Sequence, residues 1–115
     1  MKGESLKGHL ELLILAVLAD GPRHGYGVIE ELRERSGEVF DLAEGTVYPV
    51  LHRLERAGML SSEWSEVGGR RRRAYRLTAS GRAKLAADQA SWSRFSDAVA
   101  AVTRGAGRKP WPITP

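Results

Sequence analysis

The chain has 115 residues, of which 42% are hydrophobic and 28% are charged, which suits one folded domain and excludes a chain that is disordered by composition. Its 18 lysines and arginines exceed its 14 acidic residues, which gives a net charge of +4. The sequence has no cysteine, which excludes a disulfide framework, a thiolate nucleophile and a cysteine zinc site, and fits a reducing cytoplasm.

Residues 6–19 are predicted to form a helix that is apolar on nearly all sides, because they contain the run "LELLILAVLA". A surface helix of a small monomer needs only one apolar stripe, so this helix needs a second covering surface besides its own core. The run is too short to span a bilayer, which takes about 20 residues. Glu4 and Glu11 also argue against a cleaved signal sequence.

A second helix is predicted over residues 23–36, after the turn "DGP" and before the stop signal Ser36-Gly37. Gly25 and Gly27 weaken a helix, so we expect them to permit the close approach of another helix or of a phosphate group.

A third helix is predicted over residues 44–58, where valines and leucines recur at helical spacing. Pro49 costs little in a first turn, so the ordered helix is expected to begin near Thr46, which is also a good N-cap residue. Gly58 is expected to end this helix.

Two strands are predicted next, over residues 60–67 and 72–78, joined tightly at Gly68-Gly69. Four consecutive arginines, residues 70–73, then lie at the hairpin tip and down one strand, clear of the core. Such a local density of positive charge favours a polyanionic partner, nucleic acid before an anionic membrane.

A long last helix is predicted from a cap at Thr78 or Ser80 to about Gly105. Apolar residues recur along it at the spacing of a helix–helix seam, which together with the first helix predicts a homodimer. The seam residues are Leu85, Trp92, Phe95, Val99 and Val102. The predicted domains are a DNA-binding domain at 1–78, a dimerisation helix at 79–104 and a disordered tail at 105–115.

The predicted fold is mainly α with a small β-hairpin. Three helices, a hairpin and a further helix form the order of a winged helix-turn-helix, in which the third helix enters the DNA major groove and the hairpin lies along the backbone. Arginines at the hairpin tip would neutralise phosphates and release counterions.

The sequence resembles the PadR family of bacterial transcriptional regulators through "HGYGVIEEL", "GTVYPVLHRLERAGML" and "GGRRRRAYRLTASGR", over about residues 6–102. The single helix after the hairpin is similar to the short, multidrug-responsive branch. The resemblance implies a cytoplasmic dimer, usually a repressor, that binds a palindromic operator and is released by an effector. Four hairpin arginines exceed the usual charge there, and the tail with Trp111 has no counterpart in the family.

The resemblance makes Tyr48 a contact to the DNA backbone, although a half-buried tyrosine closing the core is the alternative. Which of the recognition-helix residues reads bases and which touches phosphates stays open. The expected DNA-contacting set is His24, Tyr26, Thr46, Tyr48, Pro49, His52, Arg53, Gly69, Arg70, Arg71, Arg72 and Arg73.

Trp92 is either a seam residue or, as the multidrug-responsive branch implies, one wall of a pore in which it and its symmetry mate sandwich a planar aromatic effector. The other expected lining residues are Leu12, Ala16, Phe95, Ser96 and Val99. No metal, cofactor or catalytic activity is expected, because the three histidines lack ligand spacing and no phosphate-binding loop is present.

Two other functions remain open at this point. A winged helix can serve as a protein-interaction module whose basic hairpin binds an acidic partner, since fold does not fix function. It can also bind DNA without sequence preference, as an architectural protein.

Replacing Arg70 to Arg73 with alanine is expected to weaken binding to all DNA sequences alike and to flatten the dependence of affinity on salt, because phosphate contacts carry no sequence information. Titration of labelled duplexes over a salt series measures both effects. Full affinity and an unchanged salt slope in this variant would show that the hairpin does not bind DNA.

Overall fold

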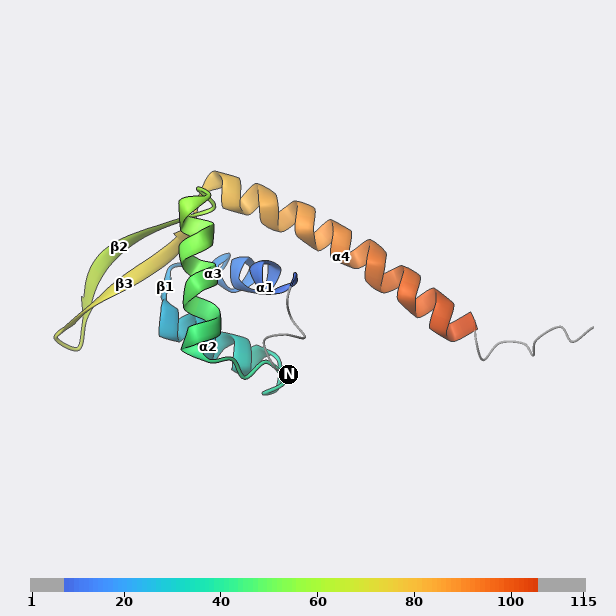
Figure 1. Cartoon of the computed structure of the whole chain (residues 1–115), viewed down its shortest axis with the longest axis horizontal. Coiled ribbons are helices and arrows are strands. Elements are labelled where there is room, and N and C mark those ends of the chain that lie inside the picture. The colour runs from blue at the N-terminus through green and yellow to red at the C-terminus, as the bar shows by residue number, and fades with distance from the viewer. Residues whose placement is uncertain (1–7, 106–115) are drawn as a thin grey trace, which may run out of the picture. The chain divides into compact units, whose positions relative to one another are not determined.

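The structure is a computed structural model that describes residues 8–105, apart from the side chain of Val67. The elements run in the order α1 (Leu10–Leu18), β1 (Arg23–His24), α2 (Gly25–Arg35), α3 (Glu44–Arg56), β2 (Leu60–Val67), β3 (Arg70–Leu77) and α4 (Ala79–Gly105), as Figure 1 shows. The chain forms two compact units that divide between Leu85 and Ala86, and each is described by itself. This mainly helical fold with a small sheet confirms the predicted fold class.

The core of the first unit lies among α1, α2 and α3 and is closed by the base of the sheet. Ile14, Leu15, Val28, Val47 and Leu51 have no exposed side-chain surface. The buried residues of α2 and α3 recur along each helix at the predicted helical spacing. Helix α1 lies within the predicted range 6–19, of which residues 6 and 7 are outside the described residues.

The second helix was predicted to start at residue 23, and this start is wrong. Arg23 and His24 form β1, which pairs antiparallel with Tyr75 and Ala74 of β3. Pairing with a strand about 50 residues away holds His24 in extended backbone, with φ −73° and ψ 157°. The sheet therefore has three strands in the order β1-β3-β2, with β3 in the centre.

The predicted start of the third helix at Thr46 is also wrong. Ala43 is the N-cap residue, its carbonyl accepts the N–H of Thr46, and Pro49 lies inside the helix. Proline removes the N–H that would pair with the carbonyl of Gly45. Gly45 and Pro49 are both exposed, so water can satisfy this carbonyl.

Gly58 ends α3 as predicted, with φ +81°. The Met59 N–H donates to the carbonyl of Leu54 at 2.9 Å, and the Gly58 N–H donates to that of Glu55 at 3.0 Å. These two bonds form a Schellman motif, which satisfies carbonyls at the helix end and turns the chain directly into β2.

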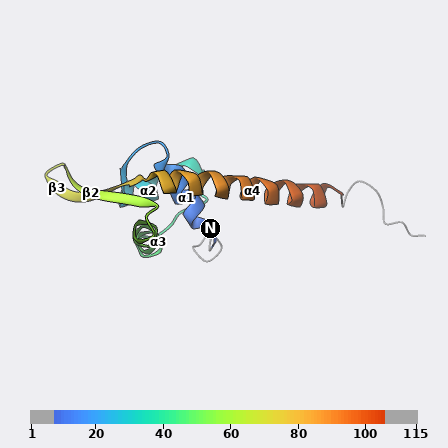
Figure 2. The ribbon, with the colours of Figure 1, turned by 90° about the horizontal axis from the view of Figure 1, so that it is seen from above.

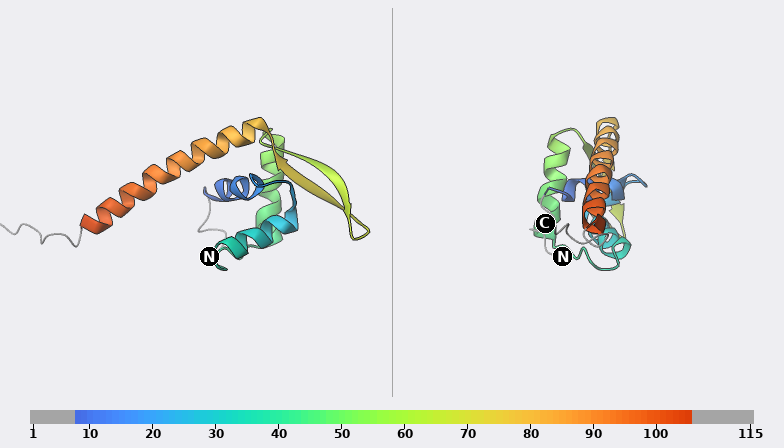
Figure 3. Two further views of the ribbon diagram at one scale, coloured as in Figure 1. Left: turned by 180° about the vertical axis from the view of Figure 1, so that it is seen from behind. Right: turned by 90° about the vertical axis from the view of Figure 1, so that its right-hand side faces the viewer.

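Strands β2 and β3 form the predicted hairpin, whose turn residues Gly68 and Gly69 have φ of +60° and +77°. Because this tight turn pairs Val67 with Arg70, β3 begins two residues before the predicted strand. The ribbon extends beyond the helices (Figures 1 and 3) and starts beside α3, which Figure 2 shows nearly end-on.

Thr78 is the N-cap residue of α4. Its hydroxyl oxygen accepts the N–H of Gly81 at 3.0 Å, and the hydroxyl donates to the carbonyl of Gly58 at 2.6 Å. The structure thus selects Thr78 over Ser80 as the cap and ties the start of α4 to the end of α3.

Beyond Leu85, α4 forms the second unit, and its large apolar side chains are exposed. Trp92 is 43% and Phe95 58% exposed, and Val99 and Val102 are exposed as well. No helix in the described part of the chain is long and apolar enough to cross a membrane. The tail predicted to be disordered lies outside the described residues beyond Gly105.

Thr78→Ala is expected to lower the free energy of unfolding by about 1 kcal/mol, because it removes the N-cap of α4. Ser80→Ala is the matched control: Ser80 is exposed within the first turn, and alanine is the better helix former, so its stability should be unchanged or slightly higher. Urea unfolding followed by circular dichroism compares the two. A larger loss in Ser80→Ala than in Thr78→Ala would contradict the assigned cap.

Candidate nucleic-acid interface

The solvent-facing side of α3 carries polar and small residues. Its exposed residues include Gly45, Pro49, His52, Arg53 and Arg56. Thr46 and Tyr48, also predicted to contact DNA, are half-buried at the edges of this side. The helix thus presents to solvent a surface that can form hydrogen bonds, opposite its buried apolar stripe.

Tyr48 lies against the first residue of α2. A Cβ atom at Gly25 would come within 2.6 Å of the Tyr48 ring and 2.7 Å of its hydroxyl oxygen. Gly25 is therefore needed for the close approach of another helix, one of the two reasons expected from the sequence. The Tyr48 ring also lies 6.3 Å from that of His52 between centroids, in a tilted arrangement.

A cleft of about 440 Å³ opens where the start of α2, the start of α3 and the hairpin meet. Its lining residues are His24, Gly25, Tyr26, Glu44, Tyr48, Trp64, Arg70, Arg71, Arg72 and Arg73. Seven of the predicted DNA contacts are brought together here, whereas Thr46, Pro49, His52, Arg53 and Gly69 are not part of the lining. Backbone N–H groups at the start of α2 and several guanidinium groups make the cleft suitable for phosphate.

The hairpin arginines differ in their neighbours. Arg73 Nε donates to Ser62 Oγ at 2.8 Å, and its Nη2 lies 3.8 Å from Glu55 Oε2 on α3. Arg76 pairs with Glu63 at 2.5 Å. Arg70, Arg71 and Arg72 form no ion pair with a carboxylate in the described part of the chain. Positive charge that is not neutralised within the protein is thus concentrated toward the tip.

Arg53 is paired within the protein. Its Nη2 lies 3.2 Å from Glu11 Oε2 on α1, and Lys84 Nζ lies 3.3 Å from the other oxygen of the same carboxylate. Arg56, by contrast, lies on the solvent-facing side of α3 and has no ion pair among the described residues. Arg56 is not in the DNA-contacting set predicted from the sequence, although its helical spacing with His52 and Pro49 was a usable signal.

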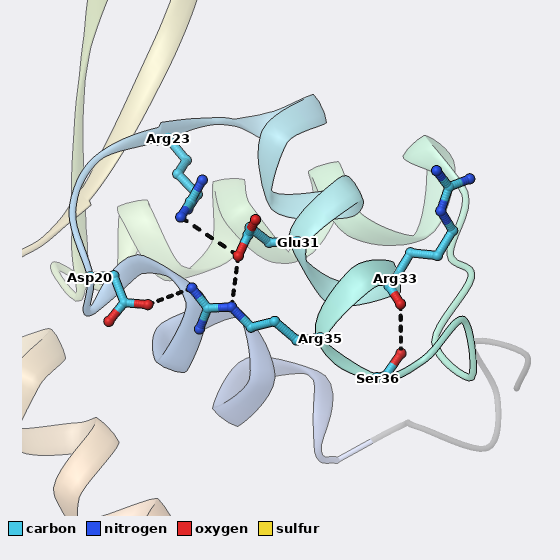
Figure 4. A network of polar contacts seen from close by, with 6 residues as sticks. All are labelled: Asp20, Arg23, Glu31, Arg33, Arg35 and Ser36. Atoms are coloured by element: carbon cyan, nitrogen blue, oxygen red, sulfur yellow. Dashed lines mark hydrogen bonds and ion pairs between the residues drawn. The ribbon is translucent and has the colours of Figure 1, made fainter.

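A polar network joins β1 and the turn after α1 to α2 (Figure 4). The Arg35 guanidinium donates from Nε to Glu31 Oε1 at 2.7 Å and binds Asp20, and Arg23 Nη2 lies 3.6 Å from the same Glu31 oxygen. The hydrogen bonds to Glu31 and Asp20 raise the pKa of Arg35 above its usual value. The network joins the turn after α1 to α2, so it supports the backbone from which His24 and Tyr26 project.

Tyr75 is the largest fully buried side chain of the core. It lies at the centre of the sheet, paired with Arg23 on one side and Ser62 on the other, and is only 1% exposed. Burial, and to a smaller extent the charge of Glu55, raises the pKa of its phenol.

The predicted effector-lining residues fall in both units. Leu12 and Ala16 are half-buried on α1 in the first unit. Trp92, Phe95, Ser96 and Val99 are exposed on α4 in the second, where the Trp92 and Phe95 ring centroids are 5.8 Å apart. Within residues 8–105, no cluster of three or more acidic or histidine side chains could hold a metal ion.

The chain is similar to transcriptional regulators over most of its length. The model of the transcriptional regulator PadR-like family matches residues 14–87. The transcriptional regulator Rv3488 of Mycobacterium tuberculosis is 44% identical over 86 residues, which cover 75% of this chain and 78% of that protein.

Solved structures are similar over most of both chains. A PadR-like transcription factor from Bacteroides fragilis is 34% identical with a TM-score of 0.72 and covers 86% of this chain and 94% of its own. A transcriptional regulator from Clostridium thermocellum is 26% identical with a TM-score of 0.77 and covers 84% and 94% of the two chains.

Gly25→Ala is expected to displace the Tyr48 ring and to destabilise the protein by about 1–3 kcal/mol, because the added methyl group overlaps the ring. Gly27→Ala is the matched control two residues on: its nearest neighbour would be 3.8 Å away, so stability should stay or rise by about 0.5–1 kcal/mol. Thermal unfolding distinguishes the two. The contact would be refuted if adding Tyr48→Ala to Gly25→Ala recovered none of the lost stability.

Proposed function

The chain belongs to the transcriptional regulator PadR-like family, whose members regulate transcription by binding DNA and are not enzymes, and from this premise we propose that it is a homodimeric repressor of an inverted-repeat operator. The observation that carries the proposal is the cleft in which the hairpin arginines, the start of α2 and Tyr48 of α3 converge.

This convergence suits one strand of the DNA backbone. A helix N-terminus and unpaired guanidinium groups both bind phosphate, and they lie beside the solvent-facing side of α3. Phosphates held in the cleft would set the register of α3 in the major groove, where His52 and Arg56 are the candidates for reaching base edges. In this proposal Arg53 must leave Glu11 before it can contact DNA.

The dimer is supported by two apolar surfaces that the single chain leaves incompletely covered. Leu12, Leu13 and Ala16 of α1 are only half-buried, and the seam residues of α4 are exposed from Trp92 to Val102. Burial of apolar surface contributes about 25 cal/mol per Å², so pairing of these surfaces between two copies is favourable. Two copies related by a twofold axis read an inverted repeat.

The proposed effector is a planar aromatic molecule bound near Trp92 and Phe95 of the dimer, with Leu12, Ala16, Ser96 and Val99 as further lining residues. In the proposed dimer a flat ligand would stack between Trp92 and its symmetry mate, and the exposed Phe95 ring, 5.8 Å from that of Trp92, would extend the aromatic surface. Binding of this effector would release the proposed cytoplasmic repressor from its operator.

Selection of bound duplexes from a random DNA pool at near-physiological salt is expected to recover an inverted repeat, with half-sites about 34 Å apart on one face of the duplex. Light scattering of the protein alone should give the mass of a dimer. The recovered operator then serves to screen planar aromatic compounds for release, and the same compounds are tested on Trp92→Ala.

The outcomes separate the remaining functions. Bound DNA without a motif would support an architectural protein that reads only the backbone. The absence of any bound DNA would exclude the repressor and favour docking of the basic hairpin on an acidic protein. Release that is unchanged in Trp92→Ala would place the effector elsewhere.

A further inference from the structure

Trp64 lies on the hairpin and does not belong to the core. Its side chain is 55% exposed, yet the guanidinium carbons of Arg71 and Arg73 lie 4.9 and 5.2 Å from its ring centroid. These distances are within the range of cation–π attraction. The half-exposed indole of Trp64 therefore contacts two guanidinium groups, those of Arg71 and Arg73.

The register of the hairpin places these three residues together. Trp64 is directly opposite Arg73, and Arg71 is its diagonal neighbour on the same face of β3. Alternation along the strand puts Arg70 and Arg72 on the opposite face. The four consecutive arginines are thus divided into two pairs, and only the pair formed by Arg71 and Arg73 faces an aromatic ring.

Arg73 is also anchored to α3. Its Nε donates to Ser62 Oγ at 2.8 Å, and the Ser62 hydroxyl donates to Glu55 Oε2 of α3 at 2.5 Å. The stack on Trp64 is therefore fixed at its inner end to the helix expected to enter the major groove. Arg71, two residues further toward the tip, lies directly opposite Glu66 in the hairpin register but forms no ion pair among the described residues. Its guanidinium contacts the Trp64 ring.

Stacking and ion pairing leave different parts of an arginine available. In the ion pair with Glu63, Arg76 uses N–H groups at the edge of its guanidinium. A guanidinium held by a ring and not by a carboxylate, such as that of Arg71, keeps its N–H groups available for a phosphate, whereas Arg73 already uses N–H groups on Ser62 and Glu55. Trp64 and Arg71 both line the cleft with Tyr26 and Tyr48, where such a phosphate would lie.

We propose that Trp64 is a positioning residue for DNA binding, which orders Arg71 and Arg73 through its ring and leaves the N–H groups of Arg71 available for the phosphates of one strand. The inference rests on the proposed function, because it explains how arginine side chains of the hairpin are ordered before DNA binds. Ordering a long side chain before binding removes part of the entropy cost of association.

The test measures the affinity for a labelled random-sequence duplex over a salt series. Trp64→Ala is expected to weaken binding roughly tenfold at each salt concentration. It should leave the salt slope unchanged, because the same phosphates are still neutralised. Trp64→Phe should recover most of the loss. The double variant Arg71→Ala/Arg73→Ala should lower the slope by about 0.9, since each phosphate contact contributes about 0.9 and Arg73 is already bound to Ser62 and Glu55.

The decisive variant combines Trp64→Ala with Arg71→Ala and Arg73→Ala. If Trp64 acts through these two arginines, the triple variant binds as the double variant does. A further tenfold loss in the triple variant would overturn the proposal, as would unchanged affinity in Trp64→Ala. Thermal unfolding of Trp64→Ala should match the wild type, because the side chain is more than half exposed. A wild type that binds no duplex would refute the proposed function together with this inference.

Discussion

The position of β3 between β1 and β2 is the constraint on which the DNA-facing surface depends. β1 leads directly into α2, and β2 follows directly from the end of α3, so one central strand sets the place of both helices. Tyr75, buried at the middle of β3, packs where the three strands meet the core. The cleft is the result, because its three sides come from elements that this strand holds in register.

Acidic side chains of the first unit determine which arginines remain available for a phosphate. Glu55 and Glu63 neutralise the inner part of the hairpin, and Glu11 binds both Arg53 and Lys84. Surface ion pairs of this kind contribute little to stability, typically less than about 1 kcal/mol. Their larger effect is on the distribution of charge, since the unpaired arginines are left toward the outer end of the ribbon, beside the cleft.

Most of the fold could be predicted from local sequence patterns. The helical spacing of apolar residues, Gly58 after α3 and Gly68-Gly69 in the hairpin are signals whose physical effect acts within a few residues. The two wrong helix starts have different causes. One depends on a partner strand that is distant in the sequence, and the other on a proline that lies inside a helix. β1 exists because of a partner about 50 residues away. Pro49 lies inside α3 at an exposed position, where water can pair with the carbonyl that proline leaves without an N–H partner.

The candidate site was predictable as a set of residue types but not as an arrangement. The family resemblance and the charge pattern indicated Tyr48, Tyr26 and the arginine run, which the structure brings to one cleft. The pairing of Arg53 with Glu11, the exposure of Arg56 and the stack on Trp64 depend on which side chains meet across different elements. Contacts between side chains of different elements cannot be predicted from local patterns in a single sequence.

The shortness of β1 has a consequence for solubility. β1 covers β3 only at Ala74 and Tyr75, so the outer half of β3 and the whole far side of β2 are open strand edges. An open edge with a half-exposed tryptophan nearby is a site where two copies can join by backbone hydrogen bonds and aggregate. Because Arg70 to Arg73 occupy the outer part of β3, two such β3 edges would repel one another, which disfavours pairing of two copies through this strand.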